Sequence, residues 1–189
     1  RLIHHEQFHR SATFHLERKL INYFLGDEKY TLQNKSKSAS DFTHNYYNKS
    51  FYDEELFEEL WQRLHDEKLV NHTLEAIRNK DIFKLSPFKE LSVEQHDLKN
   101  KVLEFCEAHV QDEASEYGSL LVIEGEAGVG KSVVLSSIFN TIQERTNDEQ
   151  SKLVETNNYL VVNHEEMLKT YKGIARQVKH LKASHFSKP

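Results

Sequence analysis

The sequence has one cysteine, two prolines and six glycines among 189 residues, and it has no long apolar run. The single Cys106 excludes an internal disulfide and is typical of a reducing compartment, so we expect a cytoplasmic protein. Cys106 lies on an apolar helical stripe, which favours a buried packing role over a nucleophile. The scarcity of proline and glycine favours long helices with few tight turns.

Membrane and secretion signals are also missing from the sequence. No run of about 18 apolar residues is present, so we predict no membrane span, and residues 1–6 lack the apolar core of a secretion signal. The net charge of −5 and the pI near 6.2 are not typical of a protein with a large basic face, although a local patch for nucleic acid is compatible with them.

Residues 1–85 have the pattern of an all-helical accessory domain. Apolar side chains at spacings of four or five predict a first helix over residues 2 to about 25, ended by Gly26 and Asp27. A polar loop is predicted over residues 27–50 and one long helix or two joined helices over 53–79. The sequence leaves the role of this domain open, and a protein partner for residues 1–85 is one alternative.

Two other features of residues 1–85 allow alternatives. Aromatic residues gather where the loop ends, at Phe42, Tyr46, Tyr47, Phe51 and Tyr52. They could stack on nucleic-acid bases, but packing against the neighbouring helices is the interpretation that we favour. His5 and His9 are four residues apart on the first helix, which leaves a two-histidine metal pair open.

Residues 86–189 alternate between helices and short apolar runs. We predict a helix from the N-cap Ser92 to about Val110. Apolar runs at 120–124 and 159–162 predict buried parallel strands, with a helix over 131–145 between them. This order indicates an α/β fold with a parallel sheet and right-handed crossovers.

The most specific motif is Gly-Glu-Ala-Gly-Val-Gly-Lys-Ser at residues 125–132, which fits the phosphate-loop template between an apolar run and a helix. Glycines let successive backbone N–H groups point at phosphate oxygens, and the helix dipole adds positive charge. We expect catalytic roles for Lys131, on the β- and γ-phosphates, and for Ser132, as a ligand of Mg²⁺. The expected nucleotide contacts are Gly125, Glu126, Ala127, Gly128, Val129, Gly130, Lys131, Ser132 and Val133.

A second motif precedes the loop. Leu91-Ser92-Val93-Glu94-Gln95 resembles the Q motif of superfamily 1 helicases, in which the glutamine reads the adenine edge. An amide offers both a donor and an acceptor for that purpose, and Phe88 is a candidate to cover the ring face. The alternative is an ordinary surface glutamine in the first turn of a helix.

A third stretch, Tyr159 to Tyr171, occupies the place of helicase motif Ia at the end of the second predicted strand. Together with residues 122–132 it resembles the Schlafen group 3-like DNA/RNA helicase family of bacterial ATPases, over roughly residues 86–189. The resemblance implies an incomplete RecA-like parallel sheet after the helical domain, with ATP and Mg²⁺ as cofactors and DNA or RNA as partner. The expected nucleic-acid contacts are Asn163, His164, Lys169, Lys172 and Arg176.

The sequence departs from that family in one respect. The acidic strand that holds Mg²⁺ and the second lobe with its arginine finger do not follow Tyr159, so we expect an N-terminal fragment truncated before the Walker B motif. The favoured hypothesis is the ATP-binding part of a helicase or translocase that is weakly active alone. The alternatives are a nucleotide-dependent switch or signalling ATPase, for instance in defence, and an interaction module with a vestigial nucleotide site.

Overall fold

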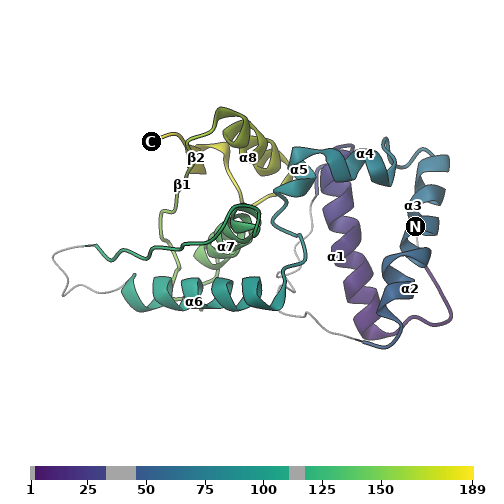
Figure 1. Ribbon diagram of the computed structural model, residues 1–189, viewed down its shortest axis with the longest axis horizontal. Coiled ribbons are helices and arrows are strands. Elements are labelled where there is room, and N and C mark those ends of the chain that lie inside the picture. Colours follow the sequence, from purple (N-terminus) through teal and green to yellow (C-terminus); the bar gives the residue numbers. More distant parts are fainter. Residues whose placement is uncertain (1–2, 33–45, 111–117) are drawn as a thin grey trace.

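The structure is a computed structural model that describes residues 3–32, 46–110 and 118–189, and most of these residues are helical (Figure 1). Helices α1 to α5 lie on the right of Figure 1, and α6, α7, α8 and two short strands lie on the left. The elements are α1 (Arg10–Asp27), α2 (Lys49–Asp53), α3 (Glu55–Asp66), α4 (Leu74–Asn79), α5 (Asp81–Lys84), α6 (Val93–His109), α7 (Lys131–Thr146), β1 (Leu160–Val161), α8 (Glu165–Gln177), the 3₁₀ turn η1 (Ala183–His185) and β2 (Phe186–Ser187).

Helix α1 confirms the first predicted helix, although it begins at Arg10 and not near residue 2. The Nδ1 atom of His9 accepts a hydrogen bond from the Ala12 backbone N–H at 3.4 Å, so His9 is the N-cap. At the other end Glu28 adopts the left-handed conformation, and its N–H donates to the Phe24 carbonyl oxygen. This geometry ends the helix directly after Asp27, where the sequence predicted its end.

An aromatic core joins α1 to α3. Phe57 and Trp61 are fully buried in it, and the Tyr23 ring from α1 lies 4.9 Å from Phe57 and 5.5 Å from Trp61, measured between ring centroids. Tyr46, Phe51 and Tyr52 pack against the same cluster, which confirms packing as their role. Tyr47 is 92% exposed, and Phe42 lies outside the described residues.

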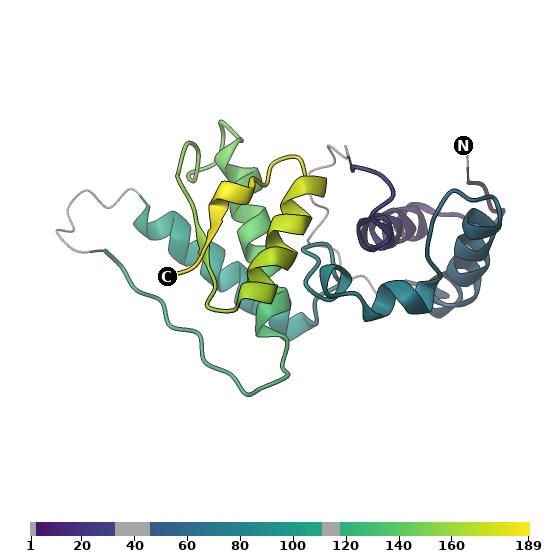
Figure 2. The same cartoon turned by 90° about the horizontal axis from the view of Figure 1, so that it is seen from above.

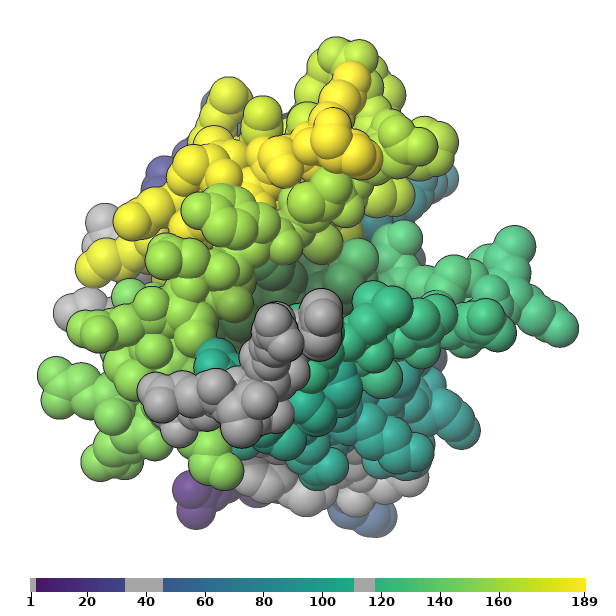
Figure 3. Space-filling model, turned by 90° about the vertical axis from the view of Figure 1, so that its left-hand side faces the viewer, coloured from purple at the N-terminus to yellow at the C-terminus, as the bar shows by residue number. Residues whose placement is uncertain are grey.

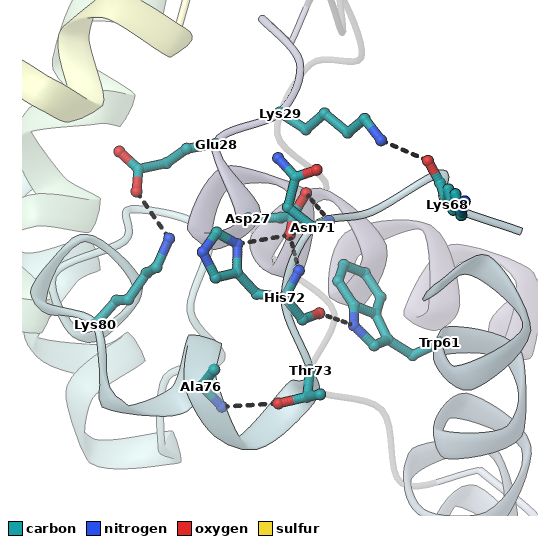
Figure 4. A network of polar contacts seen from close by, with 10 residues as sticks. All are labelled: Asp27, Glu28, Lys29, Trp61, Lys68, Asn71, His72, Thr73, Ala76 and Lys80. Atoms are coloured by element: carbon teal, nitrogen blue, oxygen red, sulfur yellow. Dashed lines mark hydrogen bonds and ion pairs between the residues drawn. The ribbon is translucent and has the colours of Figure 1, made fainter. Parts of the chain in front are cut away.

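The buried Asp27 carboxylate ties the end of α1 to the segment before α4 (Figure 4). Its Oδ1 atom accepts hydrogen bonds from the backbone N–H groups of Asn71 at 2.9 Å and His72 at 2.8 Å, and it lies 3.0 Å from His72 Nδ1. The Trp61 indole N–H donates to the His72 carbonyl at 3.0 Å. The chain between α3 and α4 therefore has these polar backbone groups satisfied by α1 and α3.

Helix α6 begins at the predicted position. Ser92 Oγ accepts from the Gln95 N–H at 3.3 Å, and Gln95 Oε1 accepts from the Ser92 N–H at 3.0 Å. These two bonds form a capping box. Helix α6 packs along α7, with Leu91, Val102, Val134 and Ile138 buried between them. Cys106 packs at the edge of this cluster, and burial raises the pKa of its thiol, as expected for a packing residue.

Strands β1 and β2 form a parallel pair of two residues each, with Leu160 opposite Phe186 and Val161 opposite Ser187. Phe186 stacks on Tyr171 of α8 at a centroid distance of 5.5 Å, which holds the pair against α8. Leu25 and Ile82, from the N-terminal helices, are buried in this same core. The two sides of the molecule seen in Figure 2 therefore share apolar contacts through α1, α5 and α8.

The expectation of an incomplete RecA-like parallel sheet is wrong for this structure. The only strands among the described residues are β1 and β2, and residues 118–126 form no strand. Figures 2 and 3 show this segment standing apart from the helices, with Leu120 85% and Val122 67% exposed. A strand needs a neighbour to pair with its N–H and C=O groups, and no described residue pairs with this apolar run.

Candidate functional site

The predicted phosphate loop joins the apolar coil at 118–124 to the start of α7. Gly128 and Gly130 both have a φ of +85°, a conformation that residues with a side chain rarely adopt. Gly130 is the N-cap of α7 and makes no side-chain cap bond, and its carbonyl accepts from the Val133 and Val134 N–H groups. The first N–H groups of a helix have no partner within that helix, so the α7 terminus presents donors toward the loop.

The Lys131 side chain turns back over the loop. Its Nζ atom donates to the carbonyl oxygens of Gly125 at 2.6 Å and Glu126 at 2.7 Å. The side chains of Glu126 and Ala127 are exposed, as is that of Lys131. An ammonium held by two carbonyl oxygens on an exposed loop can exchange them for phosphate oxygens, because both partners remain accessible to water.

Gln95 lies against this loop, as the resemblance to a Q motif requires. Its Nε2 atom donates to the Val129 carbonyl oxygen at 3.0 Å, and a Cβ atom added to Gly130 would lie 2.6 Å from the same Nε2. Because Oε1 already accepts from Ser92, the Gln95 amide links the start of α6 to the loop with both of its ends. The amide has a second N–H and a second oxygen lone pair, so reading an adenine edge does not require it to give up either bond.

Phe88 precedes α6 in the chain and packs against the core that contains Leu25 and α8. Its carbonyl oxygen accepts from Arg18 Nε of α1 at 3.4 Å. These contacts give Phe88 a packing role, and its expected place over an adenine ring stays a prediction.

Ser132, the expected Mg²⁺ ligand, lies in the first turn of α7, followed by the half-buried Val133. The Ser132 carbonyl oxygen accepts a hydrogen bond from the Tyr171 hydroxyl at 3.4 Å. Burial raises the pKa of Tyr171 to about 12, so its hydroxyl stays protonated and can donate. Sequence reasoning missed Tyr171, because its only sequence signal is an aromatic on the apolar stripe of α8.

The expected nucleic-acid contacts lie on and before α8. Asn163 and the N-cap His164 are exposed, and Lys169, Lys172 and Arg176 follow at spacings of three and four on the helix. Such spacings place the three cations on one face. Lys169 Nζ pairs with Glu166 Oε1 at 2.8 Å, and Lys188 pairs with Glu165 at 3.4 Å. The positive charge of this region is thus partly neutralised by two acids in the first turn of α8.

His5 and His9, which the sequence left open as a metal-binding pair, each accept a hydrogen bond from the backbone. His5 Nδ1 accepts from the Gln7 N–H at 3.2 Å and His9 Nδ1 caps α1. In the described part of the chain, the one group with metal-ligand geometry is His15, Asp53 and Glu90. Lys19 Nζ, however, lies 2.8 Å from Asp53 Oδ1. An ammonium on the shared carboxylate makes this group an ion-pair cluster and a poor cation site.

Comparisons with known proteins place this loop in a family context. Residues 118–189 match the family model described as Schlafen group 3, DNA/RNA helicase domain. This match supports the family that the sequence resembles, and the matched residues include the loop and α8. The superfamily 1 assignment and the status as a fragment stay predictions.

A relative in yeast covers more of the chain. The "Uncharacterized protein YPL245W" of Saccharomyces cerevisiae is 41% identical over 104 residues, which are 52% of this chain and 23% of that protein. The chain thus spans about a quarter of that relative's length, and the expected bacterial origin is unconfirmed. No solved structure matches the chain. Among the described helices, none is long and apolar enough to cross a membrane.

Proposed function

We propose that residues 125–132 bind ATP with Mg²⁺ and that the full-length protein is a nucleic-acid-dependent ATPase, a helicase or translocase. The observation that carries this proposal is the loop itself, in which two left-handed glycines lead into the N-terminus of α7 beside Lys131. The residues fit a phosphate group, because the helix donors, the ammonium and the accessible loop occur together.

Each residue has a task that its position supports. The loop N–H groups and the start of α7 would hold the β- and γ-phosphates, and Lys131 would leave the Gly125 and Glu126 carbonyls to pair with them. Ser132 would supply its hydroxyl to the metal ion, whose chemistry is to neutralise charge on the phosphates. Tyr171 would hold the Ser132 backbone in place through its hydrogen bond.

The test is steady-state ATP hydrolysis by the full-length protein, with and without single-stranded DNA or RNA. We expect stimulation by nucleic acid and loss of turnover in Lys131→Ala, because that variant lacks the ammonium on the phosphates. Lys152→Ala, which truncates an exposed lysine outside the site, is the matched control. Turnover that nucleic acid does not change would favour the nucleotide-dependent switch, and full activity of Lys131→Ala would overturn the proposal.

A further inference from the structure

A cavity of about 580 Å³ lies along one face of α1. The rest of its lining includes Asp53 at the end of α2 and residues 88–90, so the cavity is separate from the phosphate loop at the start of α7 (Figure 1). Arg10, Phe14 and Arg18 line it from α1 at spacings of four. This face of α1 therefore extends over more than two helical turns, or about 12 Å, which is long enough for a second helix to lie along it.

Aromatic side chains give the cavity an apolar wall. Phe14 of α1 is 48% exposed, and Tyr23, Tyr46 and Phe88 line the same cavity. The exposed part of Phe14 would lose its contact with water when an apolar side chain lies against it, and this loss is favourable. The wall therefore favours a partner that presents apolar side chains.

Two cations of the lining have no anion beside them. Neither Arg10 nor Lys89 forms an ion pair within the described residues. The Arg10 guanidinium lies 5.7 Å from the centroid of the Phe14 ring, and the Lys89 ammonium lies 5.9 Å from that of Phe83. A carboxylate that enters would meet both cations without displacing another anion. The charge of the lining thus favours an acidic partner.

The carboxylates of the lining already have cations of their own. Asp53 pairs with Lys19 at 2.8 Å, and Glu90 pairs with Lys49 at 2.7 Å. A nucleic-acid strand carries a phosphate on every nucleotide, so it would place phosphates near these carboxylates as well as near the cations. An amphipathic helix carries its acids at a few positions beside an apolar face. Two unpaired cations beside an aromatic wall therefore fit such a helix better than they fit a nucleic acid.

We propose that this cavity is a docking site for an acidic amphipathic helix of a partner protein. The apolar side chains of that helix would lie against Phe14 and Phe88, and its carboxylates would pair with Arg10 and Lys89. The cavity involves neither Lys131 nor Mg²⁺, so this inference goes beyond the proposed nucleotide site and does not rest on it.

The first test is a selection from a displayed library of random peptides of about 16 residues, long enough for four helical turns. The target is this chain, and the counter-target is its double variant Arg10→Glu with Lys89→Glu. We expect the retained peptides to be acidic, with apolar residues at spacings of three and four. Retention of neutral or basic peptides, or of none that depends on Arg10 and Lys89, would overturn the proposal.

Fluorescence anisotropy of the most enriched peptide then measures its affinity. The double variant should weaken binding about tenfold or more, because charge reversal repels the carboxylates. Phe14→Ala should weaken it about fivefold or more, because it removes the apolar contact. A glutamate at position 10 lies in the first turn of α1, where the helix dipole favours it. Phe14 is half exposed, and circular dichroism checks that each variant is folded.

Three control variants separate this site from general effects. Lys101→Glu reverses an exposed charge on α6, and Val93→Ala truncates an apolar side chain that is 64% exposed. Both should leave the peptide affinity within about twofold. Lys131→Ala should do the same, since the peptide does not contact the phosphate loop.

A single-stranded thymidine oligonucleotide is the probe for the nucleic-acid alternative. Its affinity for this chain should be the same before and after reversal of Arg10 and Lys89. Loss of oligonucleotide affinity in that double variant would assign the cations to nucleic acid and overturn the proposal. Unchanged peptide affinity in the double variant, or in Phe14→Ala, would overturn it as well.

Discussion

Gly130 meets two requirements at once in the phosphate loop. Its φ of +85° is a conformation in which a side chain is strained, and a Cβ atom there would lie 2.6 Å from Gln95 Nε2. A Cβ atom added to Gly118, in the coil that leads to the loop, would have no atom within 4 Å. The two glycines therefore allow a matched comparison.

We predict that Gly130→Ala strains the loop by about 1–2 kcal/mol and displaces the Gln95 amide. ATP–Mg²⁺ affinity should fall about tenfold or more, because the loop N–H groups no longer converge on the phosphates. Titration calorimetry of this variant beside Gly118→Ala checks the result. Unchanged affinity in both variants would contradict this role of the loop.

His180 and His185 are the described histidines whose lowered pKa gives stability a pH dependence near neutrality, and His180 is the more buried of the two. Its Nε2 atom lies 2.8 Å from Asn140 Oδ1, and burial lowers its pKa against the opposing charge of Glu144. The unfolded chain binds a proton on this histidine more readily than the folded protein does. The contribution of His180 to the free energy of unfolding is therefore complete above about pH 6.5 and is lost as the pH falls below it.

We therefore predict that the free energy of unfolding falls as the pH drops below about 6.5, and that His180→Gln flattens this fall. A glutamine can still donate to Asn140, so the variant keeps the hydrogen bond and removes the titration. Urea unfolding at a series of pH values measures both proteins. An equally steep dependence in His180→Gln would show that other groups are responsible.

The structural roles of several residues were predictable from the sequence, because they depend on local interactions. The Ser92 cap, the end of α1 at Asp27 and the glycines of the loop each depend on neighbours within a few residues. The contact of Tyr171 with Ser132 joins residues 39 positions apart, and only the packing of α8 creates it. No pattern of spacing along the chain contains that information.

At the scale of the helix, two glycines have opposite surroundings. A Cβ atom on Gly26 in α1 would lie 2.5 Å from Ile77 Cγ2 and 3.3 Å from Phe83 Cβ, whereas one on Gly173 in α8 would approach nothing closer than Ile82 Cδ1 at 3.9 Å. Alanine has a higher helix propensity than glycine at both positions. Packing therefore decides whether each substitution raises or lowers the free energy of unfolding.

Gly26→Ala should lower the free energy of unfolding by about 1–3 kcal/mol, because the methyl group overpacks a dense core. Gly173→Ala should raise it by about 0.5–1 kcal/mol through helix propensity. Chemical denaturation of both variants under one set of conditions measures the difference. If Gly26→Ala proved as stable as Gly173→Ala, the close approach of α1 to α4 and α5 would be contradicted.

Helix α8 carries the cations expected to contact nucleic acid. Lys172 is half-buried and Arg176 is exposed, whereas Lys169 is already paired with Glu166. We predict that Lys172→Glu combined with Arg176→Glu weakens binding of single-stranded nucleic acid about tenfold and makes binding less sensitive to salt, because fewer counterions are released. Fluorescence anisotropy over a salt series tests this, with Lys152→Glu as control. Unchanged affinity would exclude α8 as the contact surface.

The apolar run at 120–124 shows where prediction at this scale fails. Its composition is that of a buried strand, but a strand exists only where another segment pairs with its backbone. Within the described part of the chain these residues have no such neighbour, and Leu121 and Ile123 are 42% and 39% exposed. The sequence pattern thus identified a segment with a preference for strand, but it contains no information on which segment would pair with it.

For the molecule as a whole, the scarcity of proline and glycine favoured long helices and most described residues are helical, but the predicted α/β fold with a parallel sheet is wrong. Tyr46, Phe51 and Tyr52 near α2 pack as expected. The predicted boundary between residues 1–85 and 86–189 stays a prediction, as do cytoplasmic localisation and a protein partner for the first part. Leu25 and Ile82 share a core with Tyr171 and Ile174 of α8. Such contacts between distant parts of the chain depend on tertiary packing and leave no local signal.

The most direct measurement of the central claim is the titration of ATP–Mg²⁺ into this chain and into its Lys131→Ala variant. We predict saturable binding at one site, which Lys131→Ala weakens about a hundredfold or more, because it removes a charged partner of the phosphates. Lys152→Ala should bind like the unsubstituted chain. Absence of saturable binding, or equal affinity in Lys131→Ala, would contradict the assignment of residues 125–132 as a nucleotide site.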